Sequence, residues 1–347
     1  MSWNNTFYEL NINGKPIGEI ASASGIMKDV QDFFSQWTNT NETITAKTSG
    51  STGEPKSISI QKEAMVVSAK QTIEFFKINS SSILLLNLPV EFIAGKMMIL
   101  RAIVSGANLI VAEPAVNPLL HLETNTAIDF AAFTPQQVAA IFTQEKSLFL
   151  FQSIPKIIIG GGEIPEQLEK KLNGLNQEIY ATYGMTETIT HVAVRKISQG
   201  NTTKIYTVFK GITLGQDERG CLTIKANYLG KEPIITNDLV EFQGPHEFEW
   251  LGRIDNVVNS GGIKLFPEKI EAKIRHFFDR TFYLIGRQHQ TLGQSLEMVI
   301  EGDPLDDATL KLLQNMLESE LDKYEKPKKI SFLKQFERTT SGKIKRK

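Results

Sequence analysis

Short apolar segments alternate with amphipathic segments along the first half of the chain, and this alternation is the strongest constraint on its fold. The apolar segments have the length of strands, whereas the segments between them carry apolar residues at helical spacing. Such alternation is typical of a parallel or mixed sheet covered by helices, so we predict an α/β fold. The predicted strands are Lys56–Ile60, Ile83–Leu86, Asn108–Ala112, Ala127–Phe133, Lys156–Ile159 and Glu178–Tyr183, and the predicted helices are Lys62–Phe76, Gly95–Ile103 and two that Pro135 and Pro165 open.

The segments on either side of this region have a different texture. Tyr8–Ile12 is followed by Asn13-Gly14, a pair that favours a β-hairpin, and then by an amphipathic helix over Ile26–Trp37. Residues 204–240 carry strand signals separated by turn residues. We expect them to form a smaller β-rich subdomain.

From about Asp255 the pattern changes to that of a compact α+β unit. Pro267 opens a predicted helix, two strands follow, and a long helix carries leucines at helical spacing, which indicates core packing. We therefore expect two domains, residues 1–253 as a large N-terminal lobe and residues 254–347 as a small C-terminal domain.

Composition excludes several classes of protein. The 347 residues are 41% hydrophobic and carry a net charge of −1, which argues against binding to nucleic acid or to a membrane surface. Glu91, Lys96 and Arg101 interrupt the most hydrophobic region, so we expect no membrane span. The single cysteine, Cys221, suits a reducing compartment, and the first residues lack the pattern of a signal peptide. A soluble cytoplasmic protein is expected.

The stretch Thr48–Lys56 has the composition of a phosphate-binding loop. Its glycines allow the backbone to approach a ligand closely, and its hydroxyls and ammonium group can bind phosphate oxygens, so we predict a polyphosphate ligand. A solvated loop is the alternative. A Walker-type loop fits less well, because Pro55 stands where that motif needs glycine. The predicted phosphate-binding residues are Thr48, Ser49, Gly50, Ser51, Thr52, Gly53 and Lys56.

Two further loops follow predicted strands. Gly160–Glu163 is a glycine-rich turn on which a flat ring can lie, and Tyr183–Thr188 follows the next strand. Ligands of open α/β sheets bind beyond the carboxyl ends of strands, so these loops are candidates for a site. Glu187 can hold Mg²⁺, a cation that prefers carboxylate oxygen, although a carboxylate that caps the next helix is the alternative.

In order and separation, the motifs of this chain resemble those of the adenylate-forming superfamily of acyl-CoA synthetases, luciferases and peptide-synthetase adenylation domains. The resemblance implies an α/β lobe and a mobile C-terminal domain, with ATP, Mg²⁺ and CoA or a carrier-protein thiol as ligands. The motifs that carry it are Thr48–Lys56, Tyr183–Thr188, Thr236–Asp238, Gly252–Asn256, Ser260–Lys264, Pro267–Glu271 and Arg338–Lys343.

The resemblance also implies a role for individual residues. Thr48–Lys56 would close on the β- and γ-phosphates, Thr186 would contact the α-phosphate, and Lys343 would be the adenylation lysine. The remaining implied roles are adenine binding by Gly160, Gly161, Gly162, Glu163 and Tyr183, a further ATP contact at Gly184, ribose binding by Asp238 with Arg253, a hinge at Asp255, Mg²⁺ binding by Glu187, and a pantetheine tunnel along Ser260, Gly261 and Gly262.

Within the superfamily, the short segment before Thr48 and the phrase Tyr183–His191 resemble 2-succinylbenzoate:CoA ligases of menaquinone synthesis. A dicarboxylate substrate would leave one carboxylate unreacted, and that charge needs a cation or several donors in the pocket. At Glu91 and Phe92 many relatives have an aromatic residue and a histidine, so the acyl pocket is expected to be atypical. The candidate acid-binding residues are Thr134, Gln136, Thr190, His191 and Arg195.

Three functions stay in contention at this stage. The first is a small-molecule acid:CoA ligase, and the second is an enzyme that passes the adenylated acid to a carrier-protein thiol. The third is a catalytically silent binding domain, against which the retention of Glu187 and Lys343 speaks.

Overall fold

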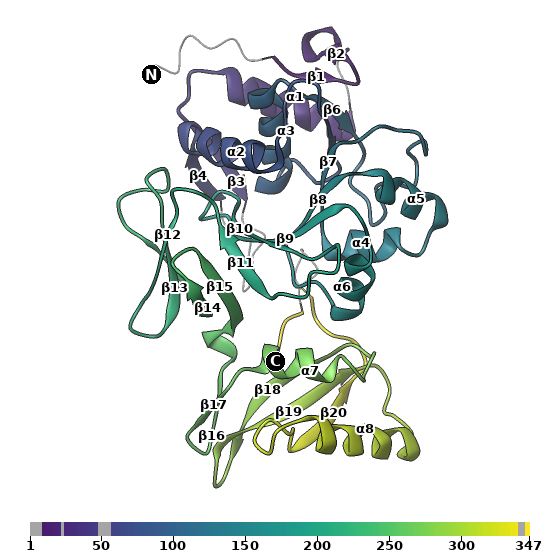
Figure 1. Cartoon of the computed structure of the whole chain (residues 1–347), viewed down its shortest axis with the longest axis vertical. Helices are drawn as coiled ribbons and strands as arrows, with labels where there is room; N and C mark the ends of the chain where they lie inside the picture. The colour runs from purple at the N-terminus through teal and green to yellow at the C-terminus, as the bar shows by residue number, and fades with distance from the viewer. Residues whose placement is uncertain (1–8, 22–23, 48–56, 339–343) are drawn as a thin grey trace. The chain divides into compact units, whose positions relative to one another are not determined.

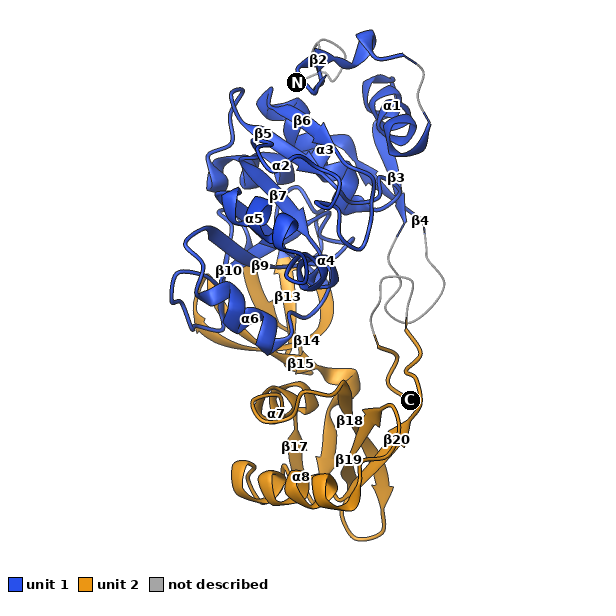
Figure 2. Cartoon of the chain, turned by 90° about the vertical axis from the view of Figure 1, so that its right-hand side faces the viewer, with its two compact units in different colours: residues 1–212, 225–234 blue, residues 213–224, 235–347 orange. Residues whose placement is uncertain are grey.

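The computed structural model describes residues 9–21, 24–47, 57–338 and 344–347. It divides into two compact units, of which unit 1 comprises residues 1–212 and 225–234 and unit 2 comprises residues 213–224 and 235–347 (Figure 2). The division that we expected, into residues 1–253 and residues 254–347, concerns functional domains and stays a prediction. No helix in the described ranges is long and apolar enough to span a bilayer.

Unit 1 is built on one large mixed sheet. Its strands follow the order β11-β10-β9-β8-β7-β5-β6-β1-β2, with parallel pairing from β9 through β5 and β6 to β1. The strands are β1 (Asn11–Ile12), β2 (Lys15–Pro16), β5 (Ile83–Leu86), β6 (Asn108–Val111), β7 (Phe130–Phe133), β8 (Lys156–Ile159), β9 (Glu178–Gly184), β10 (His191–Lys196) and β11 (Ile205–Val208), with a separate antiparallel pair of β3 (Thr43–Lys47) and β4 (Ser57–Gln61).

Helices cover both faces of this sheet. Leu84 and Leu86 of β5 pack with α1 to α3, whereas Leu85 packs with α4 to α6, so alternate side chains of one strand belong to two apolar cores. Figure 1 shows these two sets of helices on opposite sides of the sheet. The predicted α/β fold is confirmed. The helices are α1 (Gly25–Thr38), α2 (Lys62–Phe76), α3 (Ile93–Ser105), α4 (Pro135–Ile141), α5 (Glu145–Ser153), α6 (Glu166–Asn173) and the 3-10 helix η2 (Ile17–Glu19).

Unit 2 contains two sheets and two α-helices among its described residues. The strands β12 (Thr213–Gln216), β13 (Cys221–Lys225), β14 (Ile234–Gly244) and β15 (Glu247–Arg253) are neighbours in that order. After η3 (Ile254–Asn256), the second sheet has the order β17-β16-β19-β18, and β20 pairs with β19. Its strands are β16 (Val258–Ser260), β17 (Ile263–Leu265), β18 (Phe282–His289), β19 (Gly293–Glu301) and β20 (Lys329–Leu333).

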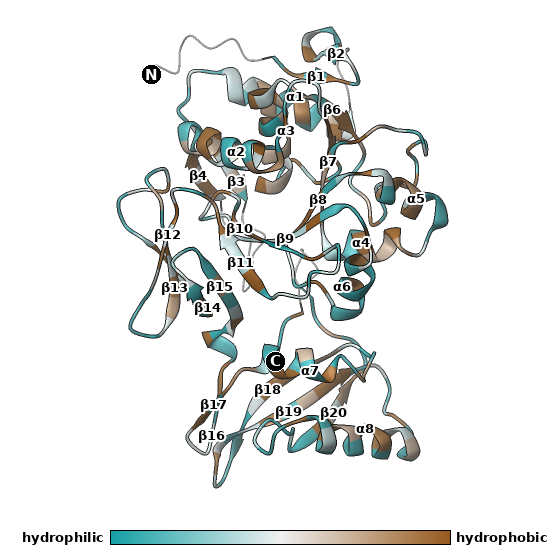
Figure 3. Cartoon of the chain, in the orientation of Figure 1, coloured by the Kyte–Doolittle hydropathy of each residue, from teal (hydrophilic) through white to brown (hydrophobic). Residues whose placement is uncertain are grey.

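The helices α7 (Pro267–Ile274) and α8 (Asp307–Glu320) pack on this second sheet. In Figure 3, hydrophobic and hydrophilic stretches alternate along α8, as expected for an amphipathic helix. Leu313 and Leu317 of α8 and the following Leu321 are buried in the core, as the leucine spacing predicts.

Candidate functional site

The carboxyl ends of β7, β8 and β9 lie at one edge of the sheet of unit 1. Phe133 pairs with Ile159, so β7 and β8 end in register, and Ile159 pairs with Ala181 of β9, which continues to Gly184. The residues that follow these strands therefore emerge side by side. This brings together the beginning of α4, the Gly160–Glu163 turn and the Tyr183–Thr188 loop.

The Gly160–Glu163 turn presents exposed backbone at this edge. Gly160 donates its N–H to the Phe133 carbonyl at 3.0 Å, and an added Cβ on Gly160 would lie 2.2 Å from Thr182 Oγ1. Gly161 has φ of +82°, in the region that favours glycine. Gly161, Gly162 and Glu163 are exposed, so a ligand can reach this part of the chain.

The loop after β9 is tightly built. Thr188 Oγ1 accepts the Met185 N–H at 2.9 Å, and a Cβ on Gly184 would lie 2.4 Å from the Thr190 carbonyl oxygen. Ile189 is buried and has φ of +70°, a strained backbone conformation for a β-branched residue. Strain of this kind persists only where the surrounding structure fixes the backbone, so the loop holds one defined shape.

Thr186 and Glu187 lie in this loop, where Thr186 is half-buried and Glu187 is exposed. No group of three or more metal-ligating His, Cys, Asp or Glu side chains exists in the described ranges. Mg²⁺ is commonly held by one or two carboxylates together with substrate phosphates and water. A single accessible carboxylate at this position suits that set of ligands.

A buried polar group lies beside the same loop; sequence reasoning named its members Thr190 and His191 as candidates but not Arg101 or Thr72. We call Arg101, Thr190, His191 and Thr72 the Arg101 cluster. Arg101 Nη2, from α3, donates to Thr190 Oγ1 at 3.3 Å, and Thr190 Oγ1 lies 3.2 Å from His191 Nδ1. His191 Nε2 lies 3.3 Å from Thr72 Oγ1 in α2. The cluster links α2 and α3 to the end of the Tyr183–Thr188 loop.

The guanidinium of Arg101 is buried, and no acidic partner for it lies in the described part of the chain. Its side chain is 2% exposed, no ion pair to it is found among the described residues, and its Nε has no hydrogen-bond partner there. Burial lowers its pKa to about 9. Burial, together with the charge of Arg101, holds the pKa of His191 well below its usual range. An unpaired buried cation is costly, and a bound carboxylate would remove that cost.

Arg195, a candidate ligand of the acid, is already paired with an acidic side chain. It donates from Nη1 and Nη2 to the two carboxylate oxygens of Glu169 at 2.7 and 3.0 Å, and Lys204 binds the same carboxylate at 2.7 Å. Burial tends to raise the pKa of Glu169, but the hydrogen bonds and charges of Arg195 and Lys204 lower it overall. Since both terminal nitrogens already bind Glu169, we assign Arg195 a structural role.

Thr134 and Gln136 lie at the start of α4. Thr134 is the N-cap, where its Oγ1 accepts the Gln137 N–H at 3.2 Å and Gln137 Oε1 accepts the Thr134 N–H at 3.0 Å. Gln136 is exposed, whereas Gln137 is buried and also donates to the Asn87 and Ala115 carbonyls. The polar side chain that faces the interior here is therefore Gln137, one position after the predicted one.

Asp238 and Arg253 lie within unit 2 and are partners in the β14–β15 pair. Asp238 Oδ1 accepts from Trp250 Nε1 at 3.1 Å, and Arg253 Nη2 binds Asp255 Oδ2 at 2.9 Å. Asn237 also donates to Asp255, at 3.2 Å. The strand pairing thus gathers the predicted ribose-binding and hinge residues into one polar group.

Ser260, Gly261 and Gly262 form the turn between β16 and β17. Ser260 pairs with Ile263, and the two glycines between them have φ of +57° and +84°. Positive φ at both central residues is the geometry of a type I′ hairpin, which requires glycine or a similar residue. Their role along a pantetheine arm stays a prediction.

The predicted phosphate-binding residues, Thr48 to Lys56, and Lys343 lie outside the described residues. The chain on both sides of the first segment is described. Lys47 at the end of β3 pairs with Ser57 at the start of β4. The residues on either side of the predicted phosphate loop are therefore neighbours.

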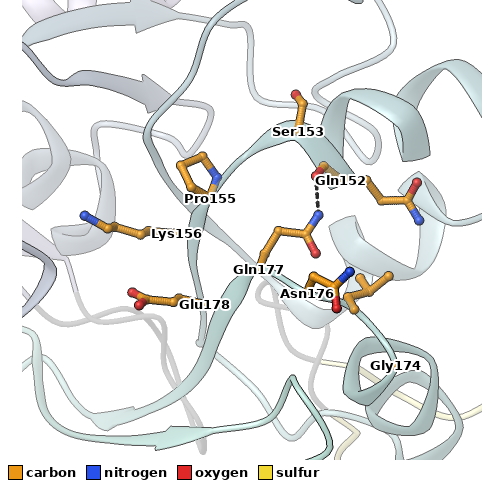
Figure 4. Close-up of a pocket in the computed structure, with 9 residues that line it drawn as sticks. Gln152, Ser153, Pro155, Lys156, Gly174, Asn176, Gln177 and Glu178 are labelled. Atoms are coloured by element: carbon orange, nitrogen blue, oxygen red, sulfur yellow. Dashed lines mark hydrogen bonds between the residues drawn. The ribbon is translucent and has the colours of Figure 1, made fainter.

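A pocket of about 760 Å³ lies elsewhere on unit 1 (Figure 4). It is lined by Lys156 and Glu178, the first residues of β8 and β9, together with Gln152 and Gln177. These residues mark the amino ends of the parallel strands, opposite to the edge that carries the loops. Since ligands of open α/β sheets bind at the carboxyl ends, we do not assign the activity to this pocket.

Comparison with known proteins relates the chain to AMP-binding enzymes. A family model described as AMP-binding enzyme matches residues 47–214. The solved structure of an acyl-CoA synthetase (AMP-forming)/AMP-acid ligase II-like protein from Dyadobacter fermentans DSM 18053 is 32% identical. The match covers 95% of each chain with a TM-score of 0.67.

Curated relatives are more distant. The 2-succinylbenzoate--CoA ligase of Lactococcus lactis subsp. lactis (strain IL1403) is 25% identical over 323 residues, which cover 88% of this chain and 70% of the relative. The D-alanine--D-alanyl carrier protein ligase of Staphylococcus aureus (strain Newman) is 26% identical over 378 residues, covering 95% of this chain and 76% of the relative. The chain spans 66% to 70% of the length of the 2-succinylbenzoate--CoA ligases from three bacteria.

Proposed function

The chain belongs to the AMP-binding enzyme family, and from this membership we propose that it joins a carboxylic acid to a thiol at the expense of ATP. In the first half-reaction a carboxylate oxygen attacks the α-phosphate of ATP, which gives an acyl adenylate and pyrophosphate. In the second, the thiol of CoA attacks the acyl carbon, and AMP leaves. We propose 2-succinylbenzoate as the acid.

The observation that carries the choice of a dicarboxylate is the unpaired guanidinium of Arg101. One carboxylate of 2-succinylbenzoate reacts, whereas the other stays negatively charged throughout. Arg101 is buried, and no acidic partner for it is found in the described part of the chain. A charge-assisted pair with the second carboxylate would satisfy both groups in a place that excludes water. A simple fatty acid would leave Arg101 unpaired.

The first half-reaction needs little proton chemistry. A carboxylate is already an anion at neutral pH, so attack on the α-phosphate depends on in-line positioning and on relief of charge repulsion. In our account Thr186 contacts the α-phosphate, and the Gly160–Glu163 turn with Tyr183 frames the adenine. Glu187 would hold Mg²⁺, which would neutralise part of the phosphate charge.

Other cations and donors complete this assignment. The segment Thr48–Lys56 would bind the β- and γ-phosphates, and Asp238 with Arg253 would bind the ribose. Lys343 would stabilise the charge that develops in the transition state, a role for which single electrostatic donors typically contribute about 10²- to 10³-fold in rate. In the second half-reaction the Gly261–Gly262 turn would border the pantetheine arm.

Transfer to a carrier-protein thiol is a second candidate. The similarity to a D-alanine--D-alanyl carrier protein ligase, at 26% identity over 95% of the chain, favours it. Both candidates share the adenylation step and differ in the thiol. The substrate also differs, since D-alanine carries an ammonium group that the cationic Arg101 would repel.

A panel of acids tests the proposal. Pyrophosphate release would be measured with 2-succinylbenzoate, benzoate, a fatty acid and D-alanine, with and without CoA. We expect release with 2-succinylbenzoate and discharge of the adenylate by free CoA. If D-alanine were the one acid of the panel that released pyrophosphate, and CoA did not discharge the adenylate, transfer to a carrier-protein thiol would replace the proposal.

A further inference from the structure

The second sheet of unit 2 holds a buried ion pair that none of the roles above uses. Glu271 of α7 has a fully buried side chain, and Arg346 near the end of the chain is 19% exposed. We propose that the Glu271–Arg346 pair is a positioning device, which holds the segment bearing Lys343 in register for the adenylation half-reaction. The proposal rests on the proposed function and adds to it two positioning residues.

The carboxylate of Glu271 is fully engaged. Its Oε1 accepts from Arg346 Nη1 and from the Leu284 N–H, both at 2.7 Å, and its Oε2 accepts from Arg346 Nη2 at 3.0 Å. Arg346 Nη1 also donates to the Leu284 carbonyl at 3.2 Å. The pair therefore joins α7, β18 and the last residues of the chain through a bidentate geometry that only arginine provides.

The last residue is fixed to the same strand. The carbonyl oxygen of Lys347 accepts from the hydroxyl of Tyr283 at 3.1 Å and from Arg287 Nη2 at 2.9 Å. Both donors belong to β18. The chain after Ile344 is thus tied down at successive residues.

The chain that leads to Lys343 is tied down as well. Glu301, at the end of β19, accepts the Phe336 N–H at 2.7 Å and pairs with Arg338 at 2.9 Å. Arg338 and Ile344 form an antiparallel bridge, and the Lys345 N–H donates to the Glu337 carbonyl at 2.8 Å. The residues on both sides of 339–343 are therefore paired with each other and with the sheet.

The anchored residues next to Lys343 bear on the rate of adenylation. Lys343 is joined by one peptide bond to Ile344, and both Ile344 and Arg346 are anchored to described residues. Catalysis by an ammonium group depends on its position, and a displacement of about 1 Å can cost about 10²-fold in rate. Loss of Arg346 should therefore slow adenylation. Thioester formation from an acyl adenylate supplied ready-made does not use Lys343 and should be spared.

The test compares Arg346→Gln with Arg275→Gln. Arg275 Nη2 also binds Glu271, at 3.4 Å, but it belongs to the end of α7 and leaves the anchors of the chain end intact. We expect Arg346→Gln to lower kcat of pyrophosphate exchange about 10- to 100-fold, with KM for ATP and the rate of thioester formation from supplied adenylate within about twofold of wild type. Arg275→Gln should leave all three near wild type.

Hydrogen exchange provides a readout that does not depend on activity. In Arg346→Gln, amides of residues 336–338 and 344–347 should lose more of their protection against exchange than those of β19 and α8. The proposal would be overturned if Arg346→Gln slowed adenylation and thioester formation equally while β19 and α8 kept their protection. It would also be overturned if Arg346→Gln and Arg275→Gln had equal effects on the measured rates. If the wild-type protein shows no exchange of pyrophosphate with any acid, the proposed function fails. Unchanged amide hydrogen exchange in Arg346→Gln would separately refute the anchoring of the chain end.

Discussion

Arg101 Nη2 donates a hydrogen bond of 3.3 Å to Thr190 Oγ1, which joins the middle of α3 to the loop after β9. Thr190 also contacts His191, and His191 contacts Thr72, so the guanidinium is held from one side by neutral groups. The charge of Arg101 itself has no counterion within the described residues. Arg101 thus differs from the other buried arginine, Arg195, whose guanidinium binds the carboxylate of Glu169.

Replacing Arg101 tests whether it binds the substrate. Arg101→Lys keeps a positive charge but loses the planar fork, and we expect it to raise KM for 2-succinylbenzoate about 10- to 100-fold, in line with the worth of a charge-assisted hydrogen bond. KM for ATP should change little. Steady-state pyrophosphate release with each substrate varied in turn measures both constants. An equal rise in the two would place Arg101 outside the acid pocket.

Arg195 should behave in the opposite way. Arg195→Met leaves Glu169 buried with only Lys204 as a partner, and we expect a loss of about 3 to 5 kcal/mol in the free energy of unfolding. KM for the acid should stay near wild type. Lys204→Met is the matched control, because the Lys204 side chain is 54% exposed and its removal should cost less than about 1 kcal/mol. Denaturant unfolding followed by a probe in unit 1 gives both values, and a small cost for Arg195→Met would contradict the structural role.

The buried histidine predicts a pH dependence of stability. His191 has a pKa lowered well below 6.5, so the folded protein keeps it neutral where the unfolded chain takes up a proton. The unfolded state then binds more protons, and stability should fall as the pH drops below about 6.5, by up to about 1.4 kcal/mol per pH unit for this one group. His191→Asn should remove this part of the slope between pH 6.5 and 5. A slope that His191→Asn does not change would contradict the prediction.

Two glycines of unit 1 offer a test of the loop geometry. A methyl group on Gly184 would lie 2.4 Å from the Thr190 carbonyl oxygen and 2.5 Å from the His191 Cα, and the backbone there has no room to yield. We expect Gly184→Ala to cost about 1 to 3 kcal/mol and to lower adenylation. At Gly174, the nearest atom to an added Cβ is 3.9 Å away, so Gly174→Ala should be close to neutral. Thermal unfolding and pyrophosphate release of the two variants make the comparison.

The sequence predicts the sheet of unit 1 well because its strands are short apolar runs. β5 and β8 begin and end where the runs do, and α2 has the predicted bounds. The helix α5 was missed, since its apolar residues form one continuous run, Leu148–Phe151, without helical spacing. The spacing of apolar residues identifies a helix by its apolar face. A short helix whose apolar residues are all consecutive has no such spacing, so its sequence does not identify it as a helix.

The site is predicted in part. The loops at the carboxyl edge follow from the order of strands, because parallel neighbours end at the same edge. In the sequence, Arg101 is a charge that interrupts an apolar segment, and nothing in its local sequence indicates the contact with Thr190. The sequence does not reveal that Arg195 is paired, because its partner, Glu169, lies in α6 and meets it only in the folded chain. Ion pairs between residues far apart in the sequence determine which buried charges have a partner within the protein and which are available to a ligand.

Acid-dependent exchange of labelled pyrophosphate into ATP is the most direct test of the central claim, that this chain adenylates a dicarboxylic acid. The account predicts exchange that requires 2-succinylbenzoate and is abolished in Lys343→Ala, while that variant still forms the thioester from supplied acyl adenylate. Absence of exchange in folded wild-type protein with every acid tested, or exchange that persists in Lys343→Ala, would contradict it.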